Sequence, residues 1–172
     1  MIYIGADHRG WKLKNQLAEL LQEDFGMNHI ADNGAYAEDF GDDYVYFGKK
    51  VCENVQQDNF HYLNLSVLRD KFDIHWPSYG ILICGSGEGM SIIANKFKGI
   101  LASLSLNSKS AVLARQHNNA NVLILQSFEE VNPTILYQTI VKPFLQTTFE
   151  NEERHLRRVL EVIDYDFNQR NI

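Results

Sequence analysis

Residues 80–96 read GILICGSGEGMSIIANK and decide the fold. The apolar run 81–83 gives way to a glycine-rich turn and then to a helical pattern, which predicts a buried strand, a tight loop and a helix. Three glycines at alternate positions let the loop bend so that bare N–H groups converge on one point. Cys84 and Ser86 bring a thiol and a hydroxyl to that point. The stretch therefore predicts an anion-binding loop in which Cys84 is a candidate low-pKa thiolate.

The loop alone also has plainer interpretations. A glycine-rich turn often serves only to reverse the chain, and a Cys at the end of an apolar strand is often a small buried side chain. Its G-x-G-x-G spacing differs from the G-x-G-x-x-G dinucleotide fingerprint, and no clear acidic residue ends a following strand. Support for a site has to come from the rest of the chain.

Composition limits the kind of protein. At 172 residues, 45% of them hydrophobic, the chain suffices for one core and is too short for two ordinary domains, so we expect a single domain over residues 1–172. A net charge of −6 argues against a nucleic-acid-binding surface, which would be basic. The two cysteines lack metal-like spacing and fit a reducing compartment. With no secretory signal and no membrane-length apolar run, we expect a cytoplasmic protein with no membrane partner.

Strands and helices are predicted to alternate along the chain. Apolar runs predict strands at 1–5, 28–32, 81–83, 99–105 and 122–125. Helical periodicity predicts helices at 11–23, 44–57, 91–97, 108–116, 133–147 and 151–168. This alternation indicates a three-layer α/β/α, Rossmann-like domain with a five-stranded parallel sheet and a C-terminal helix. Right-handed crossovers then place every loop that follows a strand at one edge of the sheet.

Two charged groups are further candidates for a site. Asp7 and His8 follow the first strand, at the edge where ligands bind in open α/β sheets, although Asp at such a boundary commonly caps the helix and His8 could be a surface residue. Arg154 and Arg158 stand four residues apart on the last helix and can face one anion together. A solvated charged face is the ordinary alternative for the two arginines.

Several motifs, taken together and in order, resemble the type B ribose-5-phosphate isomerases, a family that also includes galactose-6-phosphate isomerase subunits and allose-6-phosphate isomerases. The motifs are GADH at 5–8, GILICGSGEGMS at 80–91, ANK at 94–96, RQHN at 115–118, ANVL at 120–123, RH at 154–155 and RV at 158–159. The match covers nearly the whole chain except residues 58–78, which we interpret as an insertion. The resemblance implies an aldose–ketose isomerase of the pentose phosphate pathway that works through a cis-enediolate without metal or organic cofactor. Its most direct reaction is ribose 5-phosphate to ribulose 5-phosphate.

The resemblance also implies roles for individual residues. Cys84 looks like the base that carries the proton between C2 and C1, with Ser86 in place of the usual Thr, and His117 with Asp7 resembles the ring-opening pair. The implied substrate-binding residues are Tyr44, Asn118, the loop residues Gly85, Gly87, Glu88, Gly89 and Met90, and the phosphate grip of His8, Arg154 and Arg158. In this family both subunits of a homodimer build each site. We therefore expect a homodimer, or a dimer of dimers, in which His117 and Asn118 serve the partner subunit.

The chain also departs from the family pattern. Phe128 stands where the family commonly has a phosphate-binding arginine, Leu101 where it has a basic residue, and Val45 where it has proline. These changes leave open a hexose 6-phosphate (allose or galactose) as substrate, or a non-catalytic or repurposed sugar-phosphate-binding protein. Glu88 is the rival base in the same loop. Turnover assays on ribose, allose and galactose phosphates would distinguish these readings.

The segment 58–78 is unusually aromatic for a small domain. It contains Phe60, Tyr62 and Trp76. Apolar side chains of this size are costly to leave in water. We therefore expect these three to cover the flank of the sheet, the mouth of the site or a subunit contact.

Overall fold

The computed structural model describes residues 1–63, 76–128 and 131–168. Within these ranges the strands form one parallel sheet in the order β2-β1-β3-β5-β4. The strands are β1 (Ile2–Ala6), β2 (Ile30–Asp32), β3 (Tyr79–Cys84), β4 (Ala102–Leu104) and β5 (Val122–Gln126). The longer helices are α1 (Trp11–Phe25), α2 (Tyr44–Asn59), α5 (Ser108–Asn118) and α8 (Glu153–Asn168). The shorter helical elements are η1 (Met27–His29), η2 (Phe60–Leu63), α4 (Glu88–Ala94), α6 (Pro133–Leu136), η3 (Tyr137–Val141) and α7 (Lys142–Gln146).

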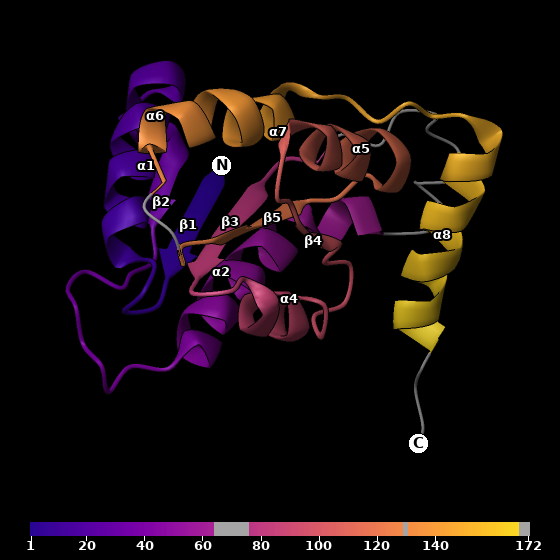
Figure 1. The fold of residues 1–172 in the computed structure, drawn as a ribbon. Helices are drawn as coiled ribbons and strands as arrows, with labels where there is room; N and C mark the ends of the chain where they lie inside the picture. Colours follow the sequence, from indigo (N-terminus) through magenta and orange to yellow (C-terminus); the bar gives the residue numbers. More distant parts are fainter. Residues whose placement is uncertain (64–75, 129–130, 169–172) are drawn as a thin grey trace.

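Helices cover both faces of the sheet, which gives the predicted three-layer, Rossmann-like fold (Figure 1). Helices α1, α5, α6 and α7 pack on one face, and α2 and α4 pack on the other. Helix α8 lies at the β4 end of the sheet and contacts α5. None of the helices in the described ranges has the length and apolarity needed to cross a bilayer.

Side chains of β3 alternate between two cores, because successive residues of a strand point to opposite faces. Ile81 and Ile83 join the core beneath α1 and α5, whereas Leu82 and Cys84 join the core beneath α2 and α4. All four are at most 5% exposed. Burial on both faces explains why residues 81–83 are a continuous apolar run rather than an alternating pattern.

The edge strands are shorter than the apolar runs predicted. The strand predicted at 99–105 is reduced to β4, because Asn121 occupies the backbone groups ahead of it: its Oδ1 accepts the N–H of Leu101 at 2.8 Å and its Nδ2 donates to Gly99 O at 2.8 Å. Helix α4 begins three residues earlier than predicted, immediately after Gly87. Side-chain hydrogen bonds and a glycine conformation set these boundaries, and hydrophobic periodicity does not report either.

Trp76, in the predicted insertion, packs beneath α8. It is 4% exposed, contacts a cluster that includes Val159 and Ile163, and its Nε1 donates to Asn119 O at 2.7 Å. Phe60 and Tyr62 are 62% and 38% exposed. The expectation that aromatic residues cover the flank of the domain therefore holds for Trp76, while residues 64–75 lie outside the described ranges.

The sheet reverses its strand order between β1 and β3. The chain runs from β1 to β2 on one side of β1, and then crosses to β3 on the other side. Ligands of open α/β sheets bind outside the carboxyl ends of the strands at such a point. The register pairs Ala6 with Ile83, and the N–H of Asp7 donates to Ile83 O at 3.3 Å. Asp7 and Cys84 therefore leave the sheet side by side at the switch point.

Candidate active site

The sulfur of Cys84 lies inside the glycine-rich loop that follows β3. The N–H of Gly87 donates a 3.2 Å hydrogen bond to Cys84 Sγ, and the N–H groups of Gly89 and Met90 also donate to it. Gly87 adopts a left-handed conformation with φ of 80°, and a Cβ there would lie 2.5 Å from Leu104 Cδ1. Glycine is therefore required at this position, and it allows three N–H groups to converge on one sulfur atom.

The pKa of the Cys84 thiol is raised above its ordinary value of 9.0. Burial is the largest cause and the charge of Asp7 adds to it, whereas the three N–H bonds from the loop lower the pKa. The prediction of a low-pKa thiolate is therefore wrong for the single chain. Loss of hydration outweighs the stabilisation that the loop dipoles give to the charged sulfur.

Asp7 closes the turn between β1 and α1. It is 6% exposed, and its Oδ1 accepts the N–H of Arg9 at 3.0 Å and of Gly10 at 3.1 Å. Burial raises the pKa of its carboxyl, while the two N–H bonds lower it. Asp7 thus holds the turn ahead of α1, whose N-cap is Gly10 without a side-chain cap, and its carboxylate acts on the neighbouring Cys84 thiol.

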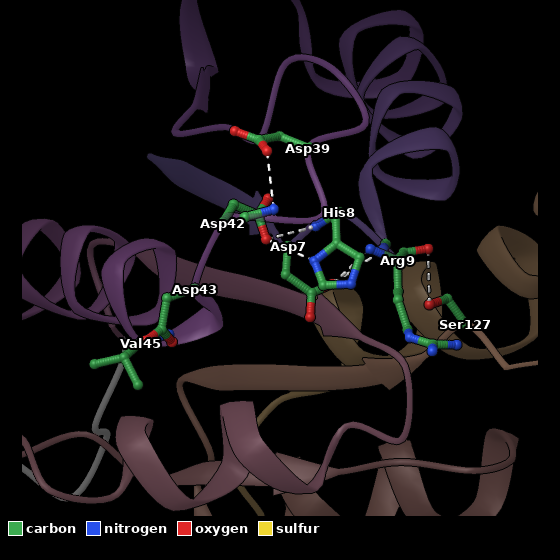
Figure 2. Close-up of polar contacts among 10 residues, drawn as sticks. Asp7, His8, Arg9, Asp39, Asp42, Asp43, Val45 and Ser127 are labelled. Atoms are coloured by element: carbon green, nitrogen blue, oxygen red, sulfur yellow. Dashed lines mark hydrogen bonds and ion pairs between the residues drawn. The ribbon is translucent and has the colours of Figure 1, made fainter.

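His8 is held in place by Asp42, as Figure 2 shows. Asp42 Oδ1 accepts the backbone N–H of His8 at 3.1 Å and lies 2.7 Å from His8 Nδ1. The ring of His8 also packs against Phe40, with ring centroids 5.6 Å apart. Because Nδ1 faces Asp42, Nε2 is the nitrogen that His8 can offer to a ligand.

Arg9 and Tyr44 lie against the backbone of the loop. A Cβ built on Gly85 would lie 2.9 Å from Arg9 Cδ, and one built on Gly89 would lie 2.9 Å from the Tyr44 ring. Arg9 is exposed and makes no ion pair with any residue of the described ranges. Figure 2 shows its side chain on the same side of the turn as that of His8. Its charge is therefore available to an anion at the loop.

Ser86 and Glu88 occupy the outer part of the loop. Ser86 Oγ accepts the N–H of Glu88 at 3.2 Å. The Glu88 side chain is exposed, whereas Cys84 Sγ receives the loop N–H groups. This geometry favours Cys84 over Glu88 as the group that faces a ligand held by the loop.

His117 lies at the opposite end of the sheet from Cys84. It is in the last turn of α5, before β5 begins, while Cys84 pairs with the last residue of β5. At about 3.3 Å per residue, the five residues of β5 span roughly 13 Å between their first and last Cα atoms. Within one chain, the structure therefore does not form the predicted pair of His117 and Asp7.

Asn118 and Arg158 meet in a pocket of about 250 Å³ bordered by α5, α8 and β4. Arg158 makes no ion pair with a residue of the described ranges, whereas Arg154 Nε contacts Glu152 Oε2 at 3.0 Å. Of the two predicted phosphate-binding arginines, Arg158 is thus the one whose charge is not already neutralised. The chain carries two separate groups of candidate residues, one at each end of the sheet.

Buried polar contacts position the end of α5. Arg115 is 1% exposed and its Nη1 donates to Asn119 Oδ1 at 2.7 Å and to Ala120 O at 2.6 Å. Asn119 ends the helix in a left-handed conformation, with φ of 48°. These bonds fix where the helix stops, and therefore where His117 and Asn118 point.

Sequence reasoning missed several residues of both groups. Asp42 and Arg9 gave no sequence signal beyond their place in loops, and Glu150 gave none at all. Glu150 Oε2 lies 3.3 Å from His117 Nε2 and 3.5 Å from His155 Nδ1. The separation of these residues along the chain carries no periodicity that would have revealed the contacts.

Comparison with known proteins places these residues in context. A family model described as Ribose/Galactose Isomerase matches residues 2–162. A probable ribose-5-phosphate isomerase B from Mycoplasma genitalium is 39% identical over 96% of this chain and 95% of its own length. Ribose-5-phosphate isomerase B from Mycobacterium tuberculosis is 32% identical over 96% of this chain and 89% of its own length.

Solved structures give the same relationship. The crystal structure of ribose-5-phosphate isomerase B from Mycoplasma genitalium with bound ribulose-5-phosphate superposes with a TM-score of 0.79 and 38% identity, covering 98% of this chain and 97% of that one. A ribose 5-phosphate isomerase from Thermotoga maritima gives 0.76 and 33%, covering 95% and 97%. Fold and sequence therefore agree over nearly the full length of both chains.

Proposed function

The chain belongs to the ribose/galactose isomerase family, and on that premise we propose that it interconverts ribose 5-phosphate and ribulose 5-phosphate. It is an aldose–ketose isomerase that moves a proton between C2 and C1 of an open-chain sugar phosphate. The observation that carries the mechanism is the thiol of Cys84, which stands at the topological switch point with three N–H groups directed at it. A phosphorylated metabolite does not cross a bilayer unaided, because charge is costly there, which supports a cytoplasmic location.

Cys84 is the proton carrier in this proposal. The thiolate takes the proton from C2 of the aldose, the C2–H electrons form the C1–C2 double bond of an enediolate, and the π electrons of the C1 carbonyl move onto O1. A proton passes from O2 to O1, the C2–O2 bond becomes the new carbonyl, and the C1–C2 π electrons take the proton back from the thiol at C1. The enediolate forms next to the loop, and the partial positive charge of the loop N–H groups favours the negative charge that develops during the reaction. Burial and the charge of Asp7 raise the pKa of the Cys84 thiol, which disfavours the thiolate that this step requires.

Phosphate binding is assigned to cations at both ends of the sheet. At the end of the sheet that carries Cys84, His8 presents Nε2 and Arg9 lies against Gly85. At the other end, Arg158 lines the pocket that it shares with Asn118. Neither arginine has an acidic partner in the described ranges. Arg9 supplies positive charge close to Phe128, since both side chains lie against Gly85, and Phe128 is the position at which the family resemblance implies an arginine. Guanidinium groups suit this role because they bind phosphate oxygens in pairs.

The separation of the two groups supports a site shared between subunits. His117 and Asn118 cannot serve Cys84 of their own chain, but a two-fold dimer repeats the same contact twice and so can complete two sites at once. In this arrangement His117 opens the sugar ring bound at the partner's Cys84, with that subunit's Asp7 beside it. The functional unit is then a homodimer or a dimer of such dimers.

Mixing inactive subunits tests the shared site. Cys84→Ala and His117→Ala homodimers are each expected to lose turnover of ribose 5-phosphate, whereas subunit exchange between them should restore it. A mixed two-fold dimer has one intact site, so statistical exchange gives about a quarter of wild-type activity. Sites contained within one chain would give no recovery.

Binding of ribose 5-phosphate by wild-type protein with no turnover would instead indicate a sugar-phosphate-binding protein. Turnover of allose or galactose 6-phosphate alone would identify a hexose phosphate isomerase.

A further inference from the structure

Three side chains near the end of α5 form a cluster of metal-ligand type. His117, Glu150 and His155 place one ligand atom each within 4.8 Å of the others. Glu150 Oε2 is central, 3.3 Å from His117 Nε2 and 3.5 Å from His155 Nδ1. We propose that these three residues bind a divalent ion of the zinc class, and that the bound ion inhibits the isomerase.

The distances match what zinc requires. Ligand atoms about 2.0–2.1 Å from a tetrahedral ion lie roughly 3.3 Å from one another, close to the two measured separations from Glu150 Oε2. The third separation, between the two histidine nitrogens, is no more than 4.8 Å, and the side chain of His117 is partly exposed. Two imidazoles with one carboxylate suit zinc, cobalt or nickel, whereas magnesium and calcium prefer oxygen ligands alone.

The buried histidine is the second observation that points to an ion. His155 is 3% exposed, and within the described part of the chain its Nδ1 makes no hydrogen bond. A buried nitrogen without a hydrogen bond normally costs free energy, and Nδ1 is directed at the Glu150 carboxylate. Coordination of a cation would satisfy it.

The backbone holds the cluster in shape before any ion arrives. The N–H of Glu150 donates to Gln116 O at 3.0 Å, which ties the segment before α8 to the last turn of α5. The rings of His117 and His155 pack with centroids 4.3 Å apart and planes inclined by 35°. His117 and Glu150 remain 37% and 39% exposed, so the fourth position of a tetrahedral ion is open to water.

Inhibition follows from which nitrogen the ion would occupy, and this part rests on the proposed function. A metal on Nε2 of His117 holds the ring in the cluster and takes away the lone pair of that nitrogen, which hinders the ring-opening role proposed for this side chain.

Binding is tested first, without reference to turnover. In Cys84→Ala protein, which lacks the competing thiol of the loop, we expect Zn²⁺ to bind with one ion per chain by calorimetry. Co²⁺ should give the visible bands of a tetrahedral site. His155→Asn should weaken Zn²⁺ affinity by more than the roughly 10- to 100-fold that loss of an outer-shell partner costs. His29→Asn, a change at an exposed histidine of η1, should leave the affinity unchanged.

Several outcomes would overturn the site. Equal Zn²⁺ affinities for His155→Asn and His29→Asn, or no binding at all, would remove it and leave the isomerase proposal intact. If His155→Asn does not fold, as judged by circular dichroism, Glu150→Gln provides the same comparison with a change of nearly equal volume.

Inhibition is then measured with Cys84 in place. Zn²⁺ should inhibit the wild type and His29→Asn reversibly with EDTA, and should have no effect on the residual rate of Glu150→Gln. Inhibition that persists in Glu150→Gln would assign the effect to the thiol and refute the inhibitory role of this cluster. Tight binding without inhibition would refute that role too, and would leave the isomerase proposal, which the mixing of inactive subunits tests, untouched.

Discussion

Replacement of Gly87 by alanine should damage both stability and the reactivity of the thiol. Two costs add: a side chain in the left-handed region costs roughly 1–2 kcal/mol, and the new Cβ would lie 2.5 Å from Leu104 Cδ1, where overpacking costs about 1–3 kcal/mol. Gly87→Ala should therefore reduce the free energy of unfolding by about 2–5 kcal/mol. Urea denaturation followed by circular dichroism measures it.

A double-mutant cycle with Leu104→Ala separates the two costs. Leu104→Ala removes the atom that the new Cβ meets, so in that background Gly87→Ala should cost only the roughly 1–2 kcal/mol of backbone strain. The same cycle followed by iodoacetamide alkylation of Cys84 reports whether the Gly87 N–H still reaches the sulfur. Equal losses of stability in the two backgrounds would refute the steric reasoning, and an unchanged alkylation rate would refute the role of this N–H.

Three further predictions concern the chemistry of the loop. Cys84→Ala should lower the isomerisation rate by at least about 10²- to 10⁴-fold while ribose 5-phosphate still binds, and the rate of Glu88→Gln should stay near wild type. If Cys84→Ala still exchanges deuterium at C2 and Glu88→Gln does not, Glu88 is the base. The rate of alkylation of Cys84 should rise with pH through a pKa above 9.0. Asp7→Asn removes a neighbouring negative charge but keeps Oδ1 as acceptor, so it should move this pKa to lower pH; a shift to higher pH would contradict the electrostatic account. Arg9→Ala should raise KM for ribose 5-phosphate by an amount equivalent to about 1.5–3 kcal/mol, whereas Arg157→Ala, whose guanidinium pairs with a glutamate on its own helix, should not; equal KM values would remove Arg9 from the phosphate site.

Local patterns were sufficient for most of the fold. The strand at 81–83, the loop and the following helix are each specified by neighbouring residues: an apolar run buried on both faces, a glycine with positive φ and a helical spacing of buried side chains. The strand-to-helix alternation then fixes a parallel sheet, since parallel strands need crossovers. Boundaries were less predictable where a single side chain, such as Asn121, bonds to backbone ahead of a strand.

The candidate site was predictable only in part. Motif resemblance named Cys84 and His117, but the pKa of the thiol depends on how much water the folded chain removes from it, and the predicted direction was wrong. The bond between His8 and Asp42 joins residues 34 positions apart. No spacing along the chain encodes such a contact.

The sequence by itself determined the order of strands and helices and the chemical groups at the end of each strand, because these depend on residues close together in the chain. Only the tertiary structure decided which groups meet. It placed Asp7 beside Cys84 through the register of β1 and β3, kept His117 at the opposite end of the sheet and assembled it with Glu150 and His155. The physical reason is that burial, charge interactions and metal-ligand geometry arise from contacts between distant segments, and those exist only once the whole chain has packed.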